Sequence, residues 1–239
     1  NLKINAQLES LPENPNVLFI VIDDLNDWTS VSGGHPQAKT PNLERLANKN
    51  SIVMQNAQCP ANVCNPSRAS FLTGLRPSST GVYGNRQNLR DAEVAASVLT
   101  LPQYFSQQGY FSLSTGKVFH RHPRPDGTKD KGEWAFDLWE DAGGGWKVDK
   151  EKIPLSGMTG SEAMVKKMDW GYTITEKEDT RDWKAAEWAA NKIQEGFSKP
   201  FFMMIGFKKP HLPWYVPQEY FDNYNLEELT TPIIKKDDL

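Results

Sequence analysis

Residues 16–22 read NVLFIVI, an apolar run that ends in the acidic pair Asp23-Asp24. A short apolar run without alternation is typical of a strand buried on both faces of a sheet. A similar run fills residues 200–207 (PFFMMIGF), and residues 110–114 are expected to form another strand. These runs predict the strands of a mostly parallel sheet, and residues 51–57 are expected to add one more.

Helix signals separate these strands. Thr40 and Pro41 mark the start of a short helix, and residues 100–108 predict another that Gly109 ends. Strands that alternate with helices predict an α/β fold, with a sheet flanked by helices on both faces. In such folds the functional site lies at the carboxyl ends of the strands.

The strongest helix pattern covers residues 181–195, between Thr180 as cap and Gly196 as stop. Its expected apolar stripe consists of Ala186, Ala189, Ala190 and Ile193. A shorter helix is expected at residues 217–220.

Residues 121–180 are rich in charged residues, Gly, Pro and Trp, and they lack clear periodicity. Loops of this length are usually functional or disordered. We therefore expect a long insertion over the active face of a single domain that spans residues 1–239.

Residues 64–68 read CNPSR and place a thiol where a helix is predicted to start. Asn65 is a suitable N-cap, Pro66 suits the first helical position, and Gly74 ends the helix. A group at this place faces unpaired backbone N–H donors, which favour an anion. Arg68 lies one turn further on and can add a fixed positive charge. The alternative is a buried structural cysteine before an ordinary helix.

Asp23 and Asp24 close the first predicted strand. Two adjacent carboxylates repel each other unless a cation or a proton lies between them, and oxygen ligands favour calcium or magnesium. A helix cap or a turn is the alternative. Asp27 is expected to be a surface acid.

Lys117 and His120 follow the strand predicted at residues 110–114, and their spacing lets both point the same way. His211 lies between two prolines whose fixed φ angles limit the conformations of the loop. A lone Lys or His in a loop is often simply solvated, which is the alternative here.

Composition limits the remaining function classes. The 239 residues, 38% of them hydrophobic, can bury one sizeable core. A net charge of −3 gives no electrostatic case for nucleic acid or an anionic membrane surface. No apolar run approaches the roughly 20 residues that span a bilayer. Two cysteines are too few for a structural zinc site, and Cys59 is expected to be a small buried thiol. His35 and His122 are expected at the surface.

The sequence resembles the type I sulfatases of the alkaline-phosphatase-like superfamily, whose signature is C-x-P-S-R. The resemblance covers about residues 16–225. It includes further landmarks in family order: VIDDL at 21–25, TPNL at 40–43, FLTG at 71–74, GKVFH at 116–120 and KPHLP at 209–213. The last two are most similar to the iduronate-2-sulfatase branch.

This resemblance implies a covalent modification and a metal. Cys64 would be converted to formylglycine by a formylglycine-generating or an anaerobic sulfatase-maturating enzyme, and its hydrated aldehyde would be the nucleophile. Arg68 would hold that group. Asp23 and Asp24 would bind calcium, with magnesium as the alternative, and the metal would also contact the modified Cys64.

The resemblance also implies roles for three further residues. Lys117 and His211 would contact the sulfate, with His211 near the leaving-group oxygen. His120 would pair with the formylglycine hydroxyl and take its proton. Together these residues would hydrolyse a sulfate ester on a carbohydrate, such as a 2-O-sulfated uronic acid or another polysaccharide unit.

Trp214 and Lys209 flank His211, and an aromatic face beside a cation could hold an anionic sugar. Packing of the loop against the sheet is an equal alternative. Two other functions stay open: a phosphonate or phosphodiester hydrolase of the same superfamily, and a non-catalytic fragment or binding module.

Family members are longer and complete their metal site in their second half with an Asp followed by Asn or His. The sequence ends at Leu239 before such a region, so we expect an N-terminal catalytic portion that a C-terminal sulfatase portion would complete. Asp222-Asn223 has the right letters but an unsuitable context. We also expect export to a bacterial periplasm or secretion rather than a lysosome, because Pro66 excludes the only candidate glycosylation site, Asn65-Pro66-Ser67.

Overall fold

The computed structural model describes residues 12–49, 51–120, 122–123, 129–143, 152–158 and 167–231. The chain divides into two compact units. Unit 1 comprises residues 1–21, 60–144 and 181–207, and unit 2 comprises residues 22–59, 145–180 and 208–239. Each unit is described by itself.

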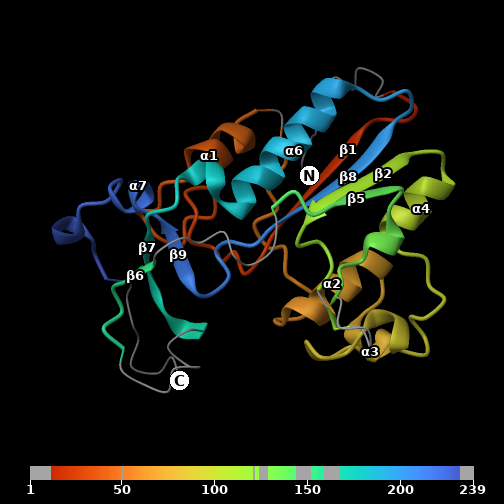
Figure 1. Ribbon diagram of the computed structural model, residues 1–239, viewed down its shortest axis with the longest axis horizontal. Helices are drawn as coiled ribbons and strands as arrows, with labels where there is room; N and C mark the ends of the chain where they lie inside the picture. The colour runs from red at the N-terminus through yellow and green to blue at the C-terminus, as the bar shows by residue number, and fades with distance from the viewer. Residues whose placement is uncertain are drawn as a thin grey trace, which may run out of the picture. The chain divides into compact units, whose positions relative to one another are not determined.

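Unit 1 is built on a four-stranded sheet in the order β1-β8-β2-β5 (Figure 1). The strands are β1 (Val17–Ile22), β8 (Phe201–Phe207), β2 (Phe111–Gly116) and β5 (Leu138–Glu140). β2 pairs in parallel with both β8 and β5, and Gly116 lies opposite Gly206 where β2 and β8 end. The predicted mostly parallel sheet is confirmed.

The prediction that residues 16–22 are buried on both faces is wrong. Among the described residues β1 lies at one edge of the sheet, and half-buried and exposed residues alternate along its first four positions. Leu18 and Ile20 are exposed on one face. An apolar run therefore marks a strand here without marking full burial.

Helices cover both faces of this sheet (Figure 1). Side chains on β8 alternate between the two faces, as the period of a strand requires. On one face Phe202 and Met204 pack in a core with residues of α2 (Cys64–Thr73) and α4 (Leu101–Gln107). On the other face Phe201, Met203 and Ile205 pack against α6 (Arg181–Glu195). Full burial of one such side chain contributes about 1.5–3 kcal/mol.

α6 has the predicted bounds, but its buried stripe differs from the prediction. The buried residues are Ala185, Trp188 and Ala189, whereas Ala186, Ala190 and Ile193 are exposed. Trp188 explains why a different face of α6 is buried. Its large ring packs on the sheet, and its Nε1 donates to Glu140 Oε2 at 2.8 Å.

Part of the segment expected as an insertion belongs to the main sheet, since β5 falls within residues 121–180. Unit 1 also contains α3 (Pro77–Thr80), the two-residue strands β3 (His122–Pro123) and β4 (Lys129–Asp130), and 3-10 helices at Leu89–Asp91 and Glu133–Ala135. It stays a prediction that the rest of residues 121–180 covers an active face.

Unit 2 contains a three-stranded sheet in the order β6-β7-β9. β6 (Lys152–Pro154) pairs antiparallel with β7 (Trp170–Thr173), and β7 pairs in parallel with β9 (Trp214–Pro217). Unit 2 also contains α1 (Pro41–Ala47), α7 (Gln218–Phe221) and 3-10 helices at Lys177–Asp179 and Leu226–Glu228. α1 starts at Pro41 as predicted, although Thr40 Oγ1 accepts a hydrogen bond from the Ser30 N–H instead of one from the helix.

Two predictions for the segment after α1 are wrong. Residues 51–57 form no strand, and Ile52 and Met54 are largely exposed. The side chain of Ser51 instead donates back to the Leu46 carbonyl at 2.6 Å, and a turn follows. Cys59 is exposed rather than buried, as a free thiol.

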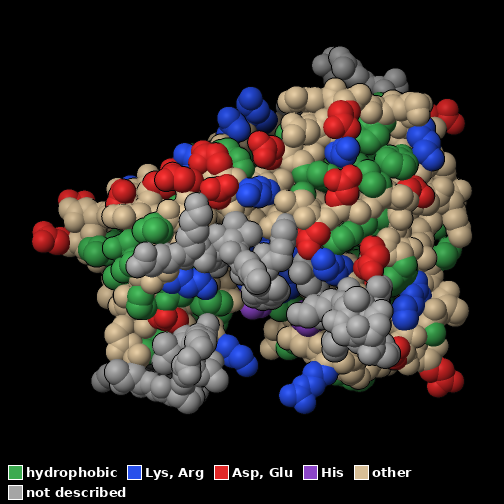
Figure 2. Space-filling model, in the orientation of Figure 1, with side chains coloured by type: hydrophobic (Ala, Val, Ile, Leu, Met, Phe, Trp, Pro, Cys, Tyr) green, Lys and Arg blue, Asp and Glu red, His purple; other side chains and the backbone are tan. Residues whose placement is uncertain are grey.

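No helix in the described ranges is long and apolar enough to cross a membrane. Figure 2 shows acidic and basic side chains interspersed on the face in view, in keeping with 27 basic and 30 acidic residues in the sequence.

Candidate active site

Cys64 is the first residue of α2 and is half-buried. Val63, in an extended conformation, occupies the N-cap position, so the prediction that Asn65 caps the helix is wrong. The Asn65 side chain is buried and donates to the Gly84 and Gln87 carbonyls at 2.8 and 2.6 Å. Its N–H donates to Asn85 Oδ1 at 3.0 Å. These bonds tie the start of α2 to the loop at 84–87 and thereby fix the position of the thiol.

Arg68 lies one turn along α2 and is only 3% exposed. Its Nη1 donates to the Val118 carbonyl at 2.9 Å and to the Lys117 carbonyl. A buried guanidinium needs such partners, because a charge removed from water is costly. Arg68 therefore holds the turn after β2, from which Lys117 and His120 project.

Two glycines let this turn approach β8. The Lys117 N–H donates to the Gly206 carbonyl at 2.7 Å. A Cβ atom on Gly206 would lie 2.0 Å from the Lys117 carbonyl carbon, and one on Gly116 would lie 2.1 Å from the Gly206 oxygen. The ends of β2 and β8 thus set the backbone position of Lys117, and only glycine fits at both places.

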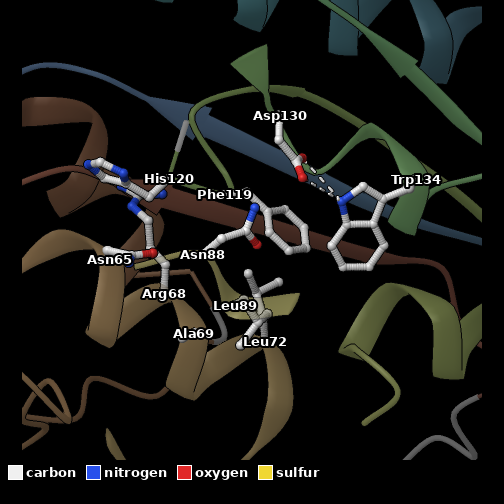
Figure 3. A pocket seen from close by; sticks show the side chains of 10 residues that line it. All are labelled: Asn65, Arg68, Ala69, Leu72, Asn88, Leu89, Phe119, His120, Asp130 and Trp134. Carbon is white, nitrogen blue, oxygen red and sulfur yellow. Dashed lines mark hydrogen bonds between the residues drawn. The ribbon is translucent and has the colours of Figure 1, made fainter. Parts of the chain in front are cut away.

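Arg68 and His120 line the same pocket in unit 1 (Figure 3). The other polar residues of its wall are Asn65, Asn88, Asp130 and Trp134. Trp134 Nε1 donates to Asp130 Oδ1 at 3.1 Å, as the dashed lines in Figure 3 show. The pocket brings together the two residues of unit 1 that the sequence assigned to the formylglycine.

Arg90 supports the far wall of this pocket. Its guanidinium lies 4.3 Å from the centroid of the Trp134 ring, and its Nη1 donates to three carbonyls of residues 95–98. Burial lowers the pKa of Arg90. Asp130, Trp134 and Arg90 carry no motif, and sequence reasoning missed them.

Asp23 and Asp24 directly follow β1 and belong to unit 2. Asp23 is 3% exposed, and Asp24 adopts a left-handed conformation with φ of 57°. Among the described residues, Asp24 is the single non-glycine residue with positive φ. This conformation is uncommon for residues other than glycine, and such residues cluster at functional sites.

His211 completes a cluster with these carboxylates. Asp23, Asp24 and His211 each offer one ligand atom, and these atoms lie within 4.8 Å of one another. The ring Nδ1 of His211 is hydrogen-bonded to the Leu212 carbonyl, which can only accept, so Nδ1 carries a proton. Nε2 therefore bears the lone pair of the neutral ring. The donor set of two carboxylates and an imidazole fits a divalent cation.

The loop that presents His211 is braced from within. The peptide bonds Lys209-Pro210 and Leu212-Pro213 are cis, and the His211 N–H donates to the Lys208 carbonyl at 2.9 Å. Lys209 Nζ donates to the Pro213 carbonyl at 2.7 Å. Lys209 was predicted to bind substrate, and in this structure its ammonium braces the loop.

Other candidate residues have different surroundings. His35 is half-buried, with Nε2 3.2 Å from the Thr230 carbonyl and its ring 5.1 Å from that of Trp28. The backbone of Asp222 ends α7, and Asp27 is exposed as predicted. The side chain of His122 lies outside the described part of the chain.

Comparison with known proteins places these residues in a family context. The family model described as Sulfatase matches residues 15–234. A protein named Sulfatase from Formosa agariphila is 37% identical over 98% of this chain and 46% of its own length. Human iduronate 2-sulfatase is 33% identical over 94% of this chain and 40% of its own length. The chain thus spans about half the length of the curated relatives it matches.

Solved structures share the fold. The phosphonate monoester hydrolase of Agrobacterium radiobacter matches with a TM-score of 0.64 at 19% identity. The match covers 91% of this chain and 45% of that one.

Proposed function

Because this chain belongs to the sulfatase family, we propose that it hydrolyses a sulfate ester on a carbohydrate with Cys64, converted to formylglycine, as the nucleophile. The observation that carries the proposal is the setting of Cys64: it opens α2, one turn before the buried cation of Arg68. Formylglycine would supply a hydrated aldehyde with two hydroxyl groups, one to attack sulfur and one to release sulfate afterwards.

The residues of unit 1 would bind and orient the reacting group. The Arg68 guanidinium is fixed by two backbone carbonyls, so it can hold a negatively charged oxygen near Cys64 without reorganising. Lys117 would bind a sulfate oxygen. His120, on the same turn as Lys117 and in the same pocket as Arg68, would remove the proton from the second hydroxyl.

The residues of unit 2 would hold the divalent cation. Asp23 and Asp24 would bind it, in the proposal calcium with magnesium as the alternative, and the cation would neutralise charge on the sulfate. His211 would contact the sulfate and protonate the leaving oxygen. A protonated Nε2 suits that role, because Nδ1 is already occupied as a donor to Leu212.

The name of the human relative supports a sugar acid as substrate. We propose a 2-O-sulfated uronic acid or another sulfated polysaccharide unit. We further propose that the protein is exported to a bacterial periplasm or secreted, and that a formylglycine-generating or anaerobic sulfatase-maturating enzyme modifies Cys64.

The test is release of inorganic sulfate from a panel of sulfated uronic-acid oligosaccharides, with the protein co-expressed with a maturating enzyme. We expect sulfate from at least one 2-O-sulfated member and none from Cys64→Ala. Paired aryl sulfate and aryl phosphonate substrates give the control. Hydrolysis of the phosphonate alone would replace the proposal by a phosphonate hydrolase, and no hydrolysis of any substrate by protein with a modified Cys64 would overturn it.

A further inference from the structure

Two exposed tryptophans lie in register on neighbouring strands of unit 2. Trp170 begins β7, Trp214 begins β9, and the two are direct partners in the parallel pairing. Their exposed fractions are 41% and 54%. Neighbouring strands lie about 4.8 Å apart, so two indole rings at partner positions stand next to each other.

Both rings project from the same face of the sheet. Along β7 and β9 exposed or half-buried residues alternate with buried ones, and partner residues share a face. Trp170, Tyr172, Trp214 and Val216 therefore line one face. Phe221 of α7 packs on Tyr172 with ring centroids 6.1 Å apart. α7 thus covers one end of this face, and the tryptophan pair remains exposed at the other.

Asp169, whose side chain is buried, forms hydrogen bonds with the backbones of both tryptophans. Asp169 Oδ1 accepts from the Trp170 N–H at 2.9 Å, and the Asp169 carbonyl accepts from the Trp214 N–H at 2.9 Å. Ser156 Oγ donates to Oδ1 at 2.6 Å, and the Tyr215 hydroxyl donates to Oδ2. One residue thus anchors both backbones, and the rings stand on a braced support.

Hydrogen bonds from Ser156 and Tyr215 lower the pKa of Asp169. The Asp169 carboxylate therefore stays ionised at neutral pH and keeps its hydrogen bonds.

We propose that Trp170 and Trp214 form a platform on which a sugar ring of a sulfated polysaccharide stacks, outside the sulfated unit itself. The proposal rests on the proposed function for the identity of the ligand. Flat aromatic faces bind the apolar faces of pyranose rings, and a fixed pair of indoles offers area at little cost in conformational entropy. Trp214, the first residue of β9, follows His211 by three residues. A sugar stacked on Trp214 would therefore neighbour the unit whose sulfate His211 contacts.

Charge around the pair favours an anionic glycan. Lys167 lies three residues before Trp170, and Lys208 lies six residues before Trp214. The nearest acid in sequence, Asp169, is buried and engaged with Ser156 and Tyr215. Figure 2 shows hydrophobic and basic side chains, with an acidic one beside them, over the region that β6, β7 and β9 occupy in Figure 1. A sulfated polysaccharide combines the sugar faces and the negative charges that such a surface binds.

The test measures binding without turnover. In a Cys64→Ala background, calorimetry gives the dissociation constants for a sulfated tetrasaccharide and for the matching sulfated monosaccharide. Loss of one stacking ring is expected to weaken tetrasaccharide binding roughly 2- to 10-fold. Trp170→Ala and Trp214→Ala should each show this effect, with a smaller effect on the monosaccharide. Trp214→Phe should retain most of the affinity.

The matched control is Trp183→Ala on α6, where the tryptophan is 39% exposed and belongs to unit 1. It should leave both constants unchanged. Equal effects of Trp170→Ala and Trp214→Ala on monosaccharide and tetrasaccharide, or effects no larger than those of the control, would overturn the platform. Because binding is measured with an inactive variant, a failure of sulfate release would count against the proposed function alone.

Discussion

His211 directs Nε2 toward the Asp24 carboxylate, 3.9 Å from its Oδ2. With Nδ1 serving as donor to Leu212, a neutral ring would turn a lone pair toward a negative charge, which is unfavourable. A divalent cation between the two groups would remove this conflict, in keeping with the cluster of ligand atoms from Asp23, Asp24 and His211.

His211→Ala should lower kcat about 10²- to 10⁴-fold, the usual loss for a general acid or a charge-stabilising contact. His35→Ala is the matched control in the same unit, since its ring contacts the Thr230 carbonyl and Trp28. Steady-state sulfate release checks both variants. Equal and small losses at the two histidines would show that His211 has only a structural role.

Calcium should raise the melting temperature of the protein, because a ligand that binds only the folded state stabilises it by about 2.7 kcal/mol at 100 times its Kd. Asp23→Asn and Asp24→Asn should lose most of this shift, and chelation should abolish sulfate release. The control is Asp27→Asn, an exposed acid near the same turn. A chelated protein with undiminished activity would exclude the metal from the mechanism.

Gly206→Ala should both destabilise the fold and misplace Lys117, because the added Cβ would meet the Lys117 backbone at 2.0 Å. Overpacking of this kind costs about 1–3 kcal/mol. Misplacement of a catalytic group by about 1 Å can lower the rate about 100-fold. Gly84→Ala is the control, since its Cβ would meet nothing closer than 3.8 Å. Thermal unfolding and kcat check both, and similar behaviour of the two variants would contradict the close approach.

Deprotonation of the Tyr215 hydroxyl should lower the free energy of unfolding in strongly alkaline solution. Burial, with the hydrogen bond to Asp169, raises the pKa of Tyr215 from its ordinary value of 10.0 to about 12. The neutral hydroxyl therefore stabilises the fold fully below pH 10, and this contribution is lost between about pH 10 and 12. Lys152, over the Tyr215 ring at 5.0 Å, is the nearby cation.

Tyr215→Phe removes that titration and one hydrogen bond to Asp169. The variant should be less stable at neutral pH, and its stability should fall less between pH 10 and 12. The stability of the variant should also fall less than that of wild type as the solution becomes acidic, because the low pKa of Asp169 depends in part on this hydrogen bond. Urea unfolding across the pH range measures the stability at neutral pH and its fall in alkali and in acid. Parallel plots of unfolding free energy against pH for variant and wild type would contradict these roles of Tyr215.

Most of the architecture could be predicted from the sequence because apolar runs and helix signals act locally. β8, β2 and α6 fall within one or two residues of their predicted bounds. The exposure of individual side chains was harder to predict than the strands and helices, since it depends on residues that are distant in the sequence. Leu18 and Ile20 are exposed because β1 takes the sheet edge, and residues 51–57 lack a strand partner in the described chain.

The candidate site divides in the same way. Cys64, Arg68 and the aspartate pair could be found from adjacency and spacing. The partners that position them could not, because Asn65 finds carbonyls about twenty residues away, at Gly84 and Gln87. The pairing of Trp170 with Trp214 likewise depends on strand register, which the long stretch of sequence between them conceals.

The most direct test of the account is the mass of the peptide that contains Cys64, from protein co-expressed with a formylglycine-generating enzyme. Conversion of the thiol to the aldehyde lowers the mass by about 18 Da, since oxygen replaces sulfur with loss of two hydrogens. We expect this loss on the Cys64 peptide and an unchanged thiol at the exposed Cys59. An unmodified Cys64 in a preparation whose maturating enzyme converts a known substrate would contradict it.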